Sequence, residues 1–171
     1  MRELARTAPR GTTHRVYLVG GATAVLQGWR ASSVDADLFA EEESVFRDIQ
    51  GIKERLNVNV EFARPEHFVP PLRDSSARHL FIETMAGVSY YHYDPYAQAL
   101  SKVVRGFERD LEDARHFVRS GLVDARRLRT LVKEIPNSAY AKYPSLSRAA
   151  VEGAVEEFLA EVEEARGRGE A

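Results

Sequence analysis

The sequence predicts an α+β fold: a small mixed β-sheet flanked by helices, followed by a helical C-terminal part. Up to about residue 94, short segments of alternating polarity are separated by a few helical segments, the order expected when a sheet packs against helices. From Pro95 onward, apolar residues recur every three to four positions, which indicates helices. We therefore expect an α/β core over residues 1–94 and a helical region over residues 95–171 that packs on this core, so that the two form one compact unit.

Composition narrows the class of protein. The 171 residues suffice for one domain with a proper core, and 44% apolar and 29% charged residues are ordinary for a soluble globular chain. The absence of cysteine excludes disulfides, thiolate zinc sites and cysteine nucleophiles. A net charge of -2 gives no general attraction to nucleic acid or membranes, and no apolar segment approaches transmembrane length. We expect a cytoplasmic protein that does not bind membranes.

Local patterns predict the elements of the first half. Residues 1–14 are expected to form a loose arm or a partial helix, and residues 64–78, which contain three prolines, a loop. Helices are expected over residues 22–27, ending at Gly28, and over residues 44–56, where apolar residues have helical spacing despite Gly51. Strands are expected over residues 15–19, 33–39, 57–62, 79–83 and 88–93.

The second half is predicted to be helical throughout. One continuous apolar stripe runs from Leu100 to Val118, and Gly121 stands where a C-terminal cap belongs. Asp124 can cap a shorter helix to about residue 134, and Ser147 can cap a last helix.

The residues that suggest chemistry lie in two neighbouring segments. Gly20 and Gly21 follow the first strand and open a helix, so their bare backbone N–H groups can approach an anion. Asp35 and Asp37 are two positions apart on the next strand, which places both carboxylates on one face, where they can hold one hard cation. Together the segments offer a place for a triphosphate and its magnesium. The alternative is that one acid caps a loop and the other is solvated.

The order and spacing of these residues resemble the signature of the polymerase-beta-type nucleotidyltransferase superfamily: Gly-Gly, about a dozen residues, then Asp-x-Asp. The continuation Arg30-x-x-Ser33-x-Asp35-x-Asp37 resembles the minimal bacterial branch that includes AbiEii-like and MenT-like toxin nucleotidyltransferases. The resemblance runs from about Val16 to the helix after Asp94. It implies Mg²⁺- or Mn²⁺-dependent transfer of a nucleoside monophosphate from a nucleoside triphosphate to an acceptor hydroxyl, with release of pyrophosphate.

Three further residues of the first half are candidates for the same site. Glu61 lies with Asn59 on the polar face of its strand, and if that strand neighbours the Asp-x-Asp strand, three acids converge and a second metal ion can bind. The resemblance implies a role for Glu61 as base or metal ligand; the alternative is a solvated glutamate. Ser33 shares the strand face of Asp35, so its hydroxyl can contact a phosphate or a metal-bound water. Arg30 can pair with an acid or a phosphate, but a turn role is favoured for both Arg30 and Ser33.

Candidates in the helical half depend more on the resemblance. Helix geometry places Lys102, Arg105, Arg109 and Asp113 within about 80° of one another, opposite the apolar stripe, which by itself describes a solvated face. The resemblance implies that Lys102 holds the nucleotide phosphates and that Asp110 or Asp113 completes the site; Asp110 is preferred because it lies nearer the apolar stripe.

Two surface features can serve either binding or structure. An aromatic run can stack on bases or, as we favour, pack a sheet face: Tyr90, Tyr91, His92, Tyr93 and Tyr96. A set of arginines can form a basic patch for tRNA or, equally, a salt-bridged surface: Arg115, Arg119, Arg126, Arg127 and Arg129.

The resemblance to toxins implies the 3′ end of tRNA or a protein side-chain hydroxyl as acceptor, and a cognate antitoxin as partner. The competing hypothesis is a nucleotide-binding or regulatory module that has lost turnover. A phosphatase of the haloacid dehalogenase type also uses Asp-x-Asp, but residues 31–34 are too polar for the apolar strand that such chemistry requires.

Overall fold

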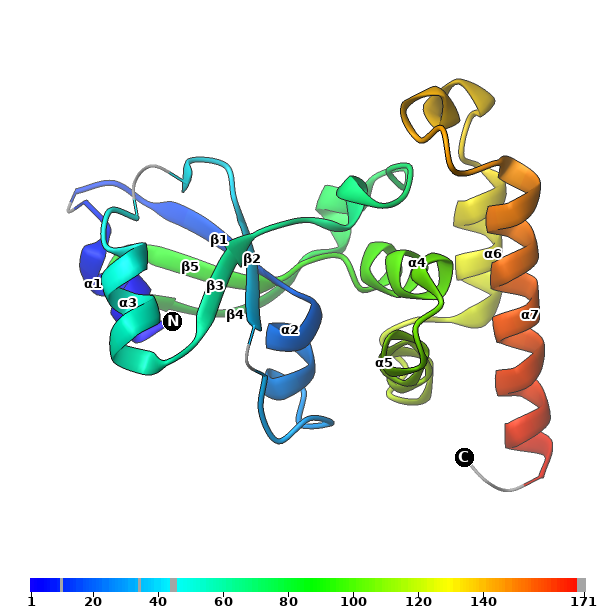
Figure 1. The fold of residues 1–171 in the computed structure, drawn as a ribbon, viewed down its shortest axis with the longest axis horizontal. Helices are drawn as coiled ribbons and strands as arrows, with labels where there is room; N and C mark the ends of the chain where they lie inside the picture. Colours follow the sequence, from blue (N-terminus) through cyan, green and yellow to red (C-terminus); the bar gives the residue numbers. More distant parts are fainter. Residues whose placement is uncertain (10, 34, 44–45, 169–171) are drawn as a thin grey trace. The chain divides into compact units, whose positions relative to one another are not determined.

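The computed structural model describes residues 1–9, 11–33, 35–43 and 46–168 (Figure 1). The chain divides into two compact units. The sheet unit comprises Met1–Arg64 and Arg78–Tyr93, and the helical unit comprises Pro65–Ala77 and Asp94–Ala171. The mixed sheet, its flanking helices and the C-terminal helices confirm the predicted α+β class.

The sheet unit is built on one five-stranded mixed sheet with the strand order β3-β2-β1-β5-β4. β1 pairs antiparallel with β2 and parallel with β5, β2 pairs parallel with β3, and β4 pairs antiparallel with β5. The strand bounds are His14–Val19 for β1, Asp35–Ala40 for β2, Asn59–Phe62 for β3, Leu80–Met85 for β4 and Val88–His92 for β5.

Helices cover one face of this sheet. α1 (Arg2–Thr7) and α3 (Ile49–Leu56) pack side by side, and α2 (Gly20–Leu26) follows β1 without a loop (Figure 1). Alternate strand residues point inward and form the core with residues of α1 and α3: Leu4, Val16, Leu18, Leu38, Ile52, Val60, Val88 and Tyr90. Gly51 is tolerated inside α3, as predicted; residues 44 and 45 of the longer predicted helix lie outside the described residues.

The opposite sheet face carries an aromatic cluster. Tyr17 on β1 lies between Phe39 and Tyr91, its register partners, with ring centroids 5.6 and 5.5 Å away. The Tyr93 and His79 rings pack against Tyr17 as well, and Tyr17 is only 5% exposed. Packing, rather than an open stacking platform, therefore accounts for the central part of the predicted aromatic run.

The helical unit contains four α-helices in the described part of the chain: α4 (Pro95–Arg105), α5 (Glu108–Arg119), α6 (Ala125–Lys133) and α7 (Arg148–Gly167). α6 and α7 lie side by side (Figure 1). Asp124 and Ser147 cap their helices as predicted, because their side chains accept hydrogen bonds from the backbone N–H groups of Arg127 and Ala150. Short 3₁₀ helices lie at Pro65–His67 (η2), Ser75–Arg78 (η3) and Asn137–Lys142 (η4).

The continuous helix predicted after Pro95 is wrong. Gly106 has a φ of 69° and ends α4 as a left-handed cap, and α5 starts again at Glu108. Phe107, which the helical pattern placed on the apolar stripe, is 64% exposed. None of the helices in the described ranges is long and apolar enough to cross a membrane.

Candidate functional site

Strands β2 and β3 bring three acids to one face of the sheet. The inward side chains of β2 include Leu38, so Asp35 and Asp37 point to the opposite face. Asp37 is the register partner of Glu61 on the parallel strand β3, which places both side chains on the same face. The strand of Asp35 and Asp37 and the strand of Glu61 are therefore neighbours. The sequence predicted that the three acids converge if these two strands are adjacent.

Asn59 joins two of these acids and was not among the predicted site residues. Its amide Nδ2 donates hydrogen bonds to Glu61 Oε1 at 2.7 Å and to Asp35 Oδ1 at 3.3 Å. An amide is the one neutral side-chain group with two donors on one nitrogen, so it can hold two carboxylates together. The signal available in the sequence was the alternation of β3, which puts Asn59 and Glu61 on one face.

Gly20 lies directly against Asp37. A Cβ atom placed on Gly20 would be 2.8 Å from Asp37 Oδ2, and Gly20 has a φ of 55°, which L-residues rarely adopt. Both the space and the backbone conformation therefore require glycine. The close approach places the partly exposed backbone of Gly20 directly beside the Asp37 carboxylate.

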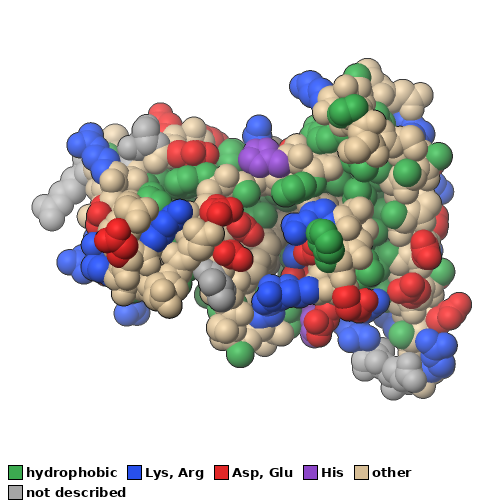
Figure 2. All heavy atoms as spheres, viewed as in Figure 1, with side chains coloured by type: hydrophobic (Ala, Val, Ile, Leu, Met, Phe, Trp, Pro, Cys, Tyr) green, Lys and Arg blue, Asp and Glu red, His purple; other side chains and the backbone are tan. Residues whose placement is uncertain are grey.

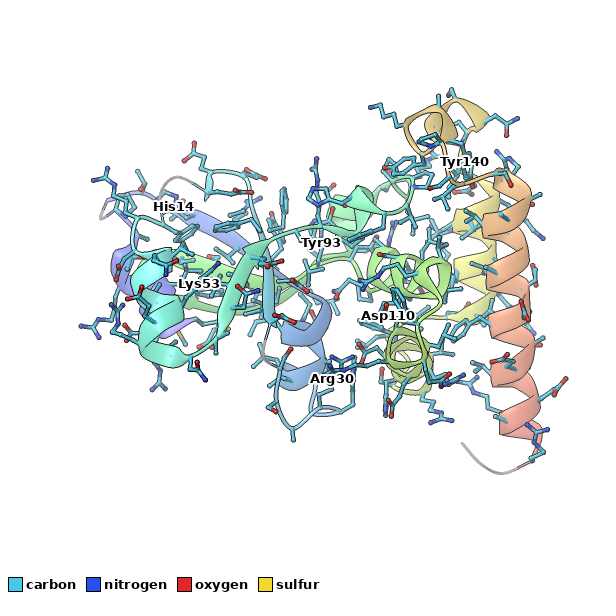
Figure 3. The ribbon with its side chains drawn as sticks, viewed as in Figure 1. His14, Arg30, Lys53, Tyr93, Asp110 and Tyr140 are labelled. Carbon is cyan, nitrogen blue, oxygen red and sulfur yellow. The ribbon has the colours of Figure 1, made fainter. Side chains whose placement is uncertain are left out.

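Gly21 and Ser33 close the turn between α2 and β2. A Cβ atom on Gly21 would collide with the Ser33 side chain, whose Oγ donates a hydrogen bond to the Asp35 carbonyl oxygen at 2.7 Å. Arg30 follows the end of α2, and its backbone N–H donates to the Ala24 carbonyl oxygen at 3.3 Å (Figure 3). The hydrogen bond of Ser33 agrees with the turn role that the sequence favoured for it, and the role of the Arg30 side chain stays a prediction.

The donor set of this face suits a hard divalent cation. Mg²⁺ binds oxygen ligands and is commonly held by one or two protein carboxylates together with water and substrate phosphates. Asp35 and Asp37 supply two such carboxylates, and Glu61 is the next acid across the sheet. Among the described residues, no three acid or histidine side chains converge closely enough to hold a metal ion by themselves. A cation bound by Asp35 and Asp37 would therefore need further oxygen ligands, such as those of water and phosphate.

The predicted residues of the helical half form a second charged cluster. Lys102 Nζ on α4 lies 2.6 Å from Asp113 Oδ2 and 3.1 Å from Asp110 Oδ1, both on α5. Arg105 Nε lies 3.2 Å from Asp110 Oδ2. Figure 3 shows Asp110 on α5 beside α4. Lys102 is 6% and Asp113 2% exposed, so the solvated face that helix geometry predicted is wrong for these residues.

The two charged groups belong to different units of the fold. The glycine pair, Ser33 and the acids Asp35, Asp37 and Glu61 are in the sheet unit, whereas Lys102, Asp110 and Asp113 are in the helical unit. Within each unit, the fold brings together residues that the sequence singled out separately.

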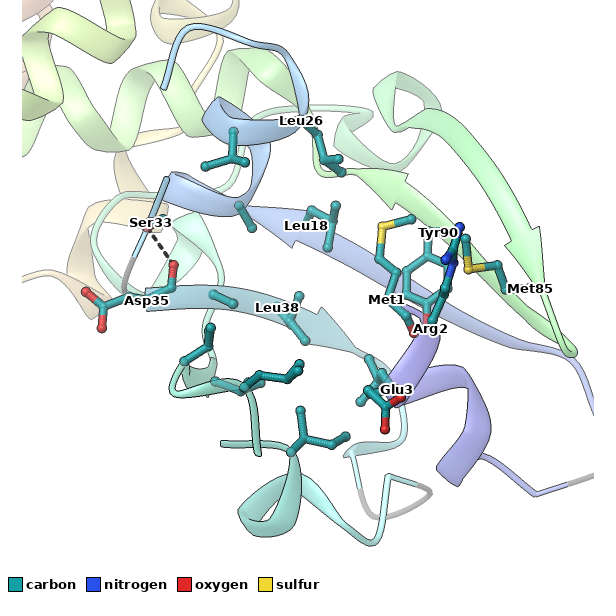
Figure 4. A pocket seen from close by; sticks show the side chains of 18 of the residues that line it. Met1, Arg2, Glu3, Leu18, Leu26, Ser33, Asp35, Leu38, Met85 and Tyr90 are labelled. Carbon is teal, nitrogen blue, oxygen red and sulfur yellow. Dashed lines mark hydrogen bonds between the residues drawn. The ribbon is translucent and has the colours of Figure 1, made fainter. Parts of the chain in front are cut away.

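An apolar cavity of about 700 Å³ opens on the core face of the sheet unit (Figure 4). Leu18, Leu38 and Tyr90 of the sheet wall it together with Leu26 of α2. Its lining is mainly aliphatic, although Ser33 and Asp35 belong to it as well, and burying a triphosphate against the aliphatic part would cost far too much free energy. The polar face that carries Asp37 is therefore the better place for phosphate chemistry.

The predicted arginine patch is partly neutralised. Arg129 pairs with Glu156 at 2.8 Å and with Glu163 at 3.0 Å, and Arg115 pairs with Glu108 at 3.0 Å. Figure 2 shows that basic and acidic side chains also lie close to one another on the face in view. Of the two alternatives, the salt-bridged surface describes these two arginines.

Comparison with known proteins places the chain in a family. No curated protein and no solved structure gives a significant match. A family model described as "Nucleotidyltransferase of unknown function (DUF6036)" matches residues 1–163. Because this match covers nearly the whole chain, the protein belongs to this nucleotidyltransferase family.

Proposed function

We propose that the protein transfers a nucleoside monophosphate from a nucleoside triphosphate to an acceptor hydroxyl. The observation that carries this proposal is the arrangement of Asp35, Asp37 and Glu61 on one face of β2 and β3, with the bare backbone of Gly20 against Asp37. This arrangement places carboxylate oxygens that can bind a cation next to a turn whose backbone N–H groups phosphate oxygens can approach. Membership of a nucleotidyltransferase family supports the reaction class.

Asp35 and Asp37 would hold Mg²⁺ or Mn²⁺, with Glu61 as a further ligand. When bound, such an ion neutralises phosphate charge and orients the α-phosphate for in-line attack. The backbone N–H groups of Gly20 and Gly21 would hold phosphate oxygens, because glycine leaves no side chain in their way. Ser33 would hold the segment between α2 and β2 through its hydrogen bond to the Asp35 carbonyl oxygen, and Arg30 would pair with a phosphate or with an acid of the site.

Glu61 is the proposed base of the transfer. The acceptor oxygen attacks the α-phosphorus, the bond from that phosphorus to the oxygen of the departing pyrophosphate breaks, and the hydroxyl proton passes to the Glu61 carboxylate. Glu61 is exposed and one strand away from Asp37, which leaves it accessible to an acceptor. Asn59 holds its carboxylate in place through Oε1.

Lys102 has a proposed role of its own. The resemblance to toxin nucleotidyltransferases supports phosphate binding by Lys102, with Asp110 or Asp113 fixing its ammonium group. Their hydrogen bonds support the second half of this role, because two buried carboxylates hold one lysine in a single orientation.

The same resemblance supports the 3′ end of tRNA or a protein hydroxyl as acceptor, and a toxin that works with a cognate antitoxin. The experiment is label transfer: the protein is incubated with Mg²⁺, each α-labelled nucleoside triphosphate in turn, and total tRNA or lysate protein. Asp37→Asn is expected to abolish labelling, whereas Glu42→Gln, a matched change of an exposed acid outside the site, should leave it intact. Labelling that survives Asp37→Asn would refute the assignment.

A catalytically inactive nucleotide-binding module is the second candidate. It is favoured by Asn59, whose amide hydrogen bonds occupy one oxygen of the Asp35 carboxylate and one oxygen of the Glu61 carboxylate. Binding of a nucleoside triphosphate by calorimetry, without label on any acceptor, would identify this module.

A further inference from the structure

A buried histidine lies beneath the helix that carries the glycine pair. His92 is the last residue of β5 and is 6% exposed. Its register partners are Leu18 on β1 and Leu80 on β4. Its two ring nitrogens face α2: Nδ1 lies 3.3 Å from Thr23 Oγ1, and Nε2 lies 2.9 Å from Gln27 Nε2.

The hydrogen bonds around His92 determine its protonation. The Thr23 hydroxyl donates its one proton to the Leu18 carbonyl oxygen at 3.0 Å, so toward His92 it accepts and Nδ1 must carry hydrogen. The Gln27 amide nitrogen can only donate, so His92 Nε2 must accept. Both ends therefore require the same form of the ring, neutral with hydrogen on Nδ1.

This arrangement ties α2 to the sheet at two points. Thr23 lies in the middle of α2, and Gln27 is its C-terminal cap residue. A helix of seven residues is not stable by its own hydrogen bonds, so tertiary contacts decide where it sits. Because Gly20 and Gly21 are its first two residues, whatever holds α2 also places the glycine pair beside Asp37.

We propose that neutral His92 is a positioning residue that fixes α2, and with it Gly20 and Gly21, on the sheet through Thr23 and Gln27. The inference rests on the proposed function, because it takes Gly20 and Gly21 to be the residues that bind the triphosphate. His92 touches no reacting atom and acts only through the helix. Its protonation would place an N–H against the Gln27 amide and weaken the attachment.

The surroundings of His92 favour the neutral ring. Burial lowers its pKa below the ordinary value of 6.5, and no charged side chain among the described residues offsets this effect. The side chains that face it from the adjacent elements, Leu18, Leu80, Thr23 and Gln27, are all uncharged. We therefore expect the attachment to hold at neutral pH and to fail in mildly acidic solution.

The first test is nuclear magnetic resonance of the full chain with ¹⁵N-labelled histidine, combined with hydrogen exchange of the α2 amides. We expect hydrogen on Nδ1 at pH 7.5. Protection of the α2 amides, after correction for intrinsic rates, should fall about fivefold as His92 protonates, the factor expected for one lost hydrogen bond. His92→Gln keeps an acceptor for Gln27 and a donor for Thr23, so its α2 should stay protected at both pH values. His92→Phe should lower protection throughout.

Gln27→Leu provides a variant that leaves the buried ring in place, since Gln27 is exposed. It should lower α2 protection roughly fivefold, as expected for one hydrogen bond. Hydrogen on Nε2, or unchanged α2 protection in both His92→Phe and Gln27→Leu, would overturn the inference.

Binding of each of the four magnesium nucleoside triphosphates is measured in parallel by calorimetry. We expect wild-type affinity, relative to His92→Gln, to fall between pH 7.5 and 5.5. If no triphosphate binds to the wild-type protein although α2 responds as predicted, the proposed function fails while the positioning role of His92 stands. If triphosphates bind but the protection of α2 does not depend on His92, the positioning role of His92 fails while the proposed function stands.

Discussion

Gly20 and Asp37 are in such close contact that no side chain fits between them: a Cβ atom on Gly20 would be 2.8 Å from Asp37 Oδ2. Gly20 directly follows the end of β1, and Asp37 belongs to the antiparallel neighbour β2, where it is the register partner of Val19. The sheet itself therefore places the glycine turn beside the carboxylate.

Gly20→Ala is expected to lower both stability and nucleotidyl transfer. The substitution forces an L-residue into a φ of 55°, at a cost of about 1–2 kcal/mol, and adds the collision with Asp37. Gly28→Ala is the matched control, since Gly28 has a φ of 85° but nothing within 4 Å of the added atom. Urea denaturation and label transfer should show a larger stability loss for Gly20→Ala and an activity loss for that variant alone. Equal losses of stability and of activity in Gly20→Ala and Gly28→Ala would contradict the contact between Gly20 and Asp37.

Asn59→Ala should reduce transfer with little effect on stability. The change removes the donor that joins Asp35 and Glu61, so the two carboxylates repel each other when no cation is present. Because both hydrogen bonds are exposed, we expect a stability loss of about 1 kcal/mol or less. Thermal melting and label transfer across a Mg²⁺ titration provide the check. Wild-type activity at every Mg²⁺ concentration would show that Asn59 has no part in the site.

Lys102→Met should be among the most destabilising single changes. It leaves the buried Asp110 and Asp113 carboxylates without their shared cation, and breaking a buried ion pair in this way costs roughly 3–5 kcal/mol. Arg105→Met removes a cation whose side chain is 39% exposed and should cost about 1 kcal/mol or less. The triple variant Lys102→Met, Asp110→Asn, Asp113→Asn should recover much of the loss, because both aspartates become uncharged and Arg105, which loses its partner Asp110, is partly exposed to solvent. Chemical denaturation distinguishes these outcomes.

The free energy of unfolding should decrease as the pH falls below about 6.5, because His92 is neutral in the folded protein. The pKa of His92 is lowered in the folded protein, so the unfolded chain binds the proton more readily. The contribution of the neutral ring is therefore complete above the ordinary pKa of 6.5 and is lost as the pH falls below it. The difference in unfolding free energy between wild type and His92→Gln isolates this effect from the other histidines. A difference that does not change with pH would contradict the prediction.

Local patterns were enough to predict the parts of the site that depend on near neighbours in the chain. A strand repeats every two residues, so Asp35 and Asp37 had to share a face once β2 was recognised. Helix caps follow from one side chain and the N–H group three residues on, so Asp124 and Ser147 were also predictable. In contrast, the apolar pattern around Gly106 fits both one helix and two, and the local pattern led to the wrong choice there.

The sequence by itself determined the fold class, the Asp-x-Asp face and the glycine turn, because each depends on residues a few positions apart. Only the tertiary structure decided that β3 lies beside β2, that Asn59 joins Asp35 to Glu61, and that Lys102 is buried between two aspartates. Strand order and helix packing depend on the burial of apolar surface between segments that are far apart in the chain. The spacing of apolar residues within one segment carries no information about which distant segment it packs against.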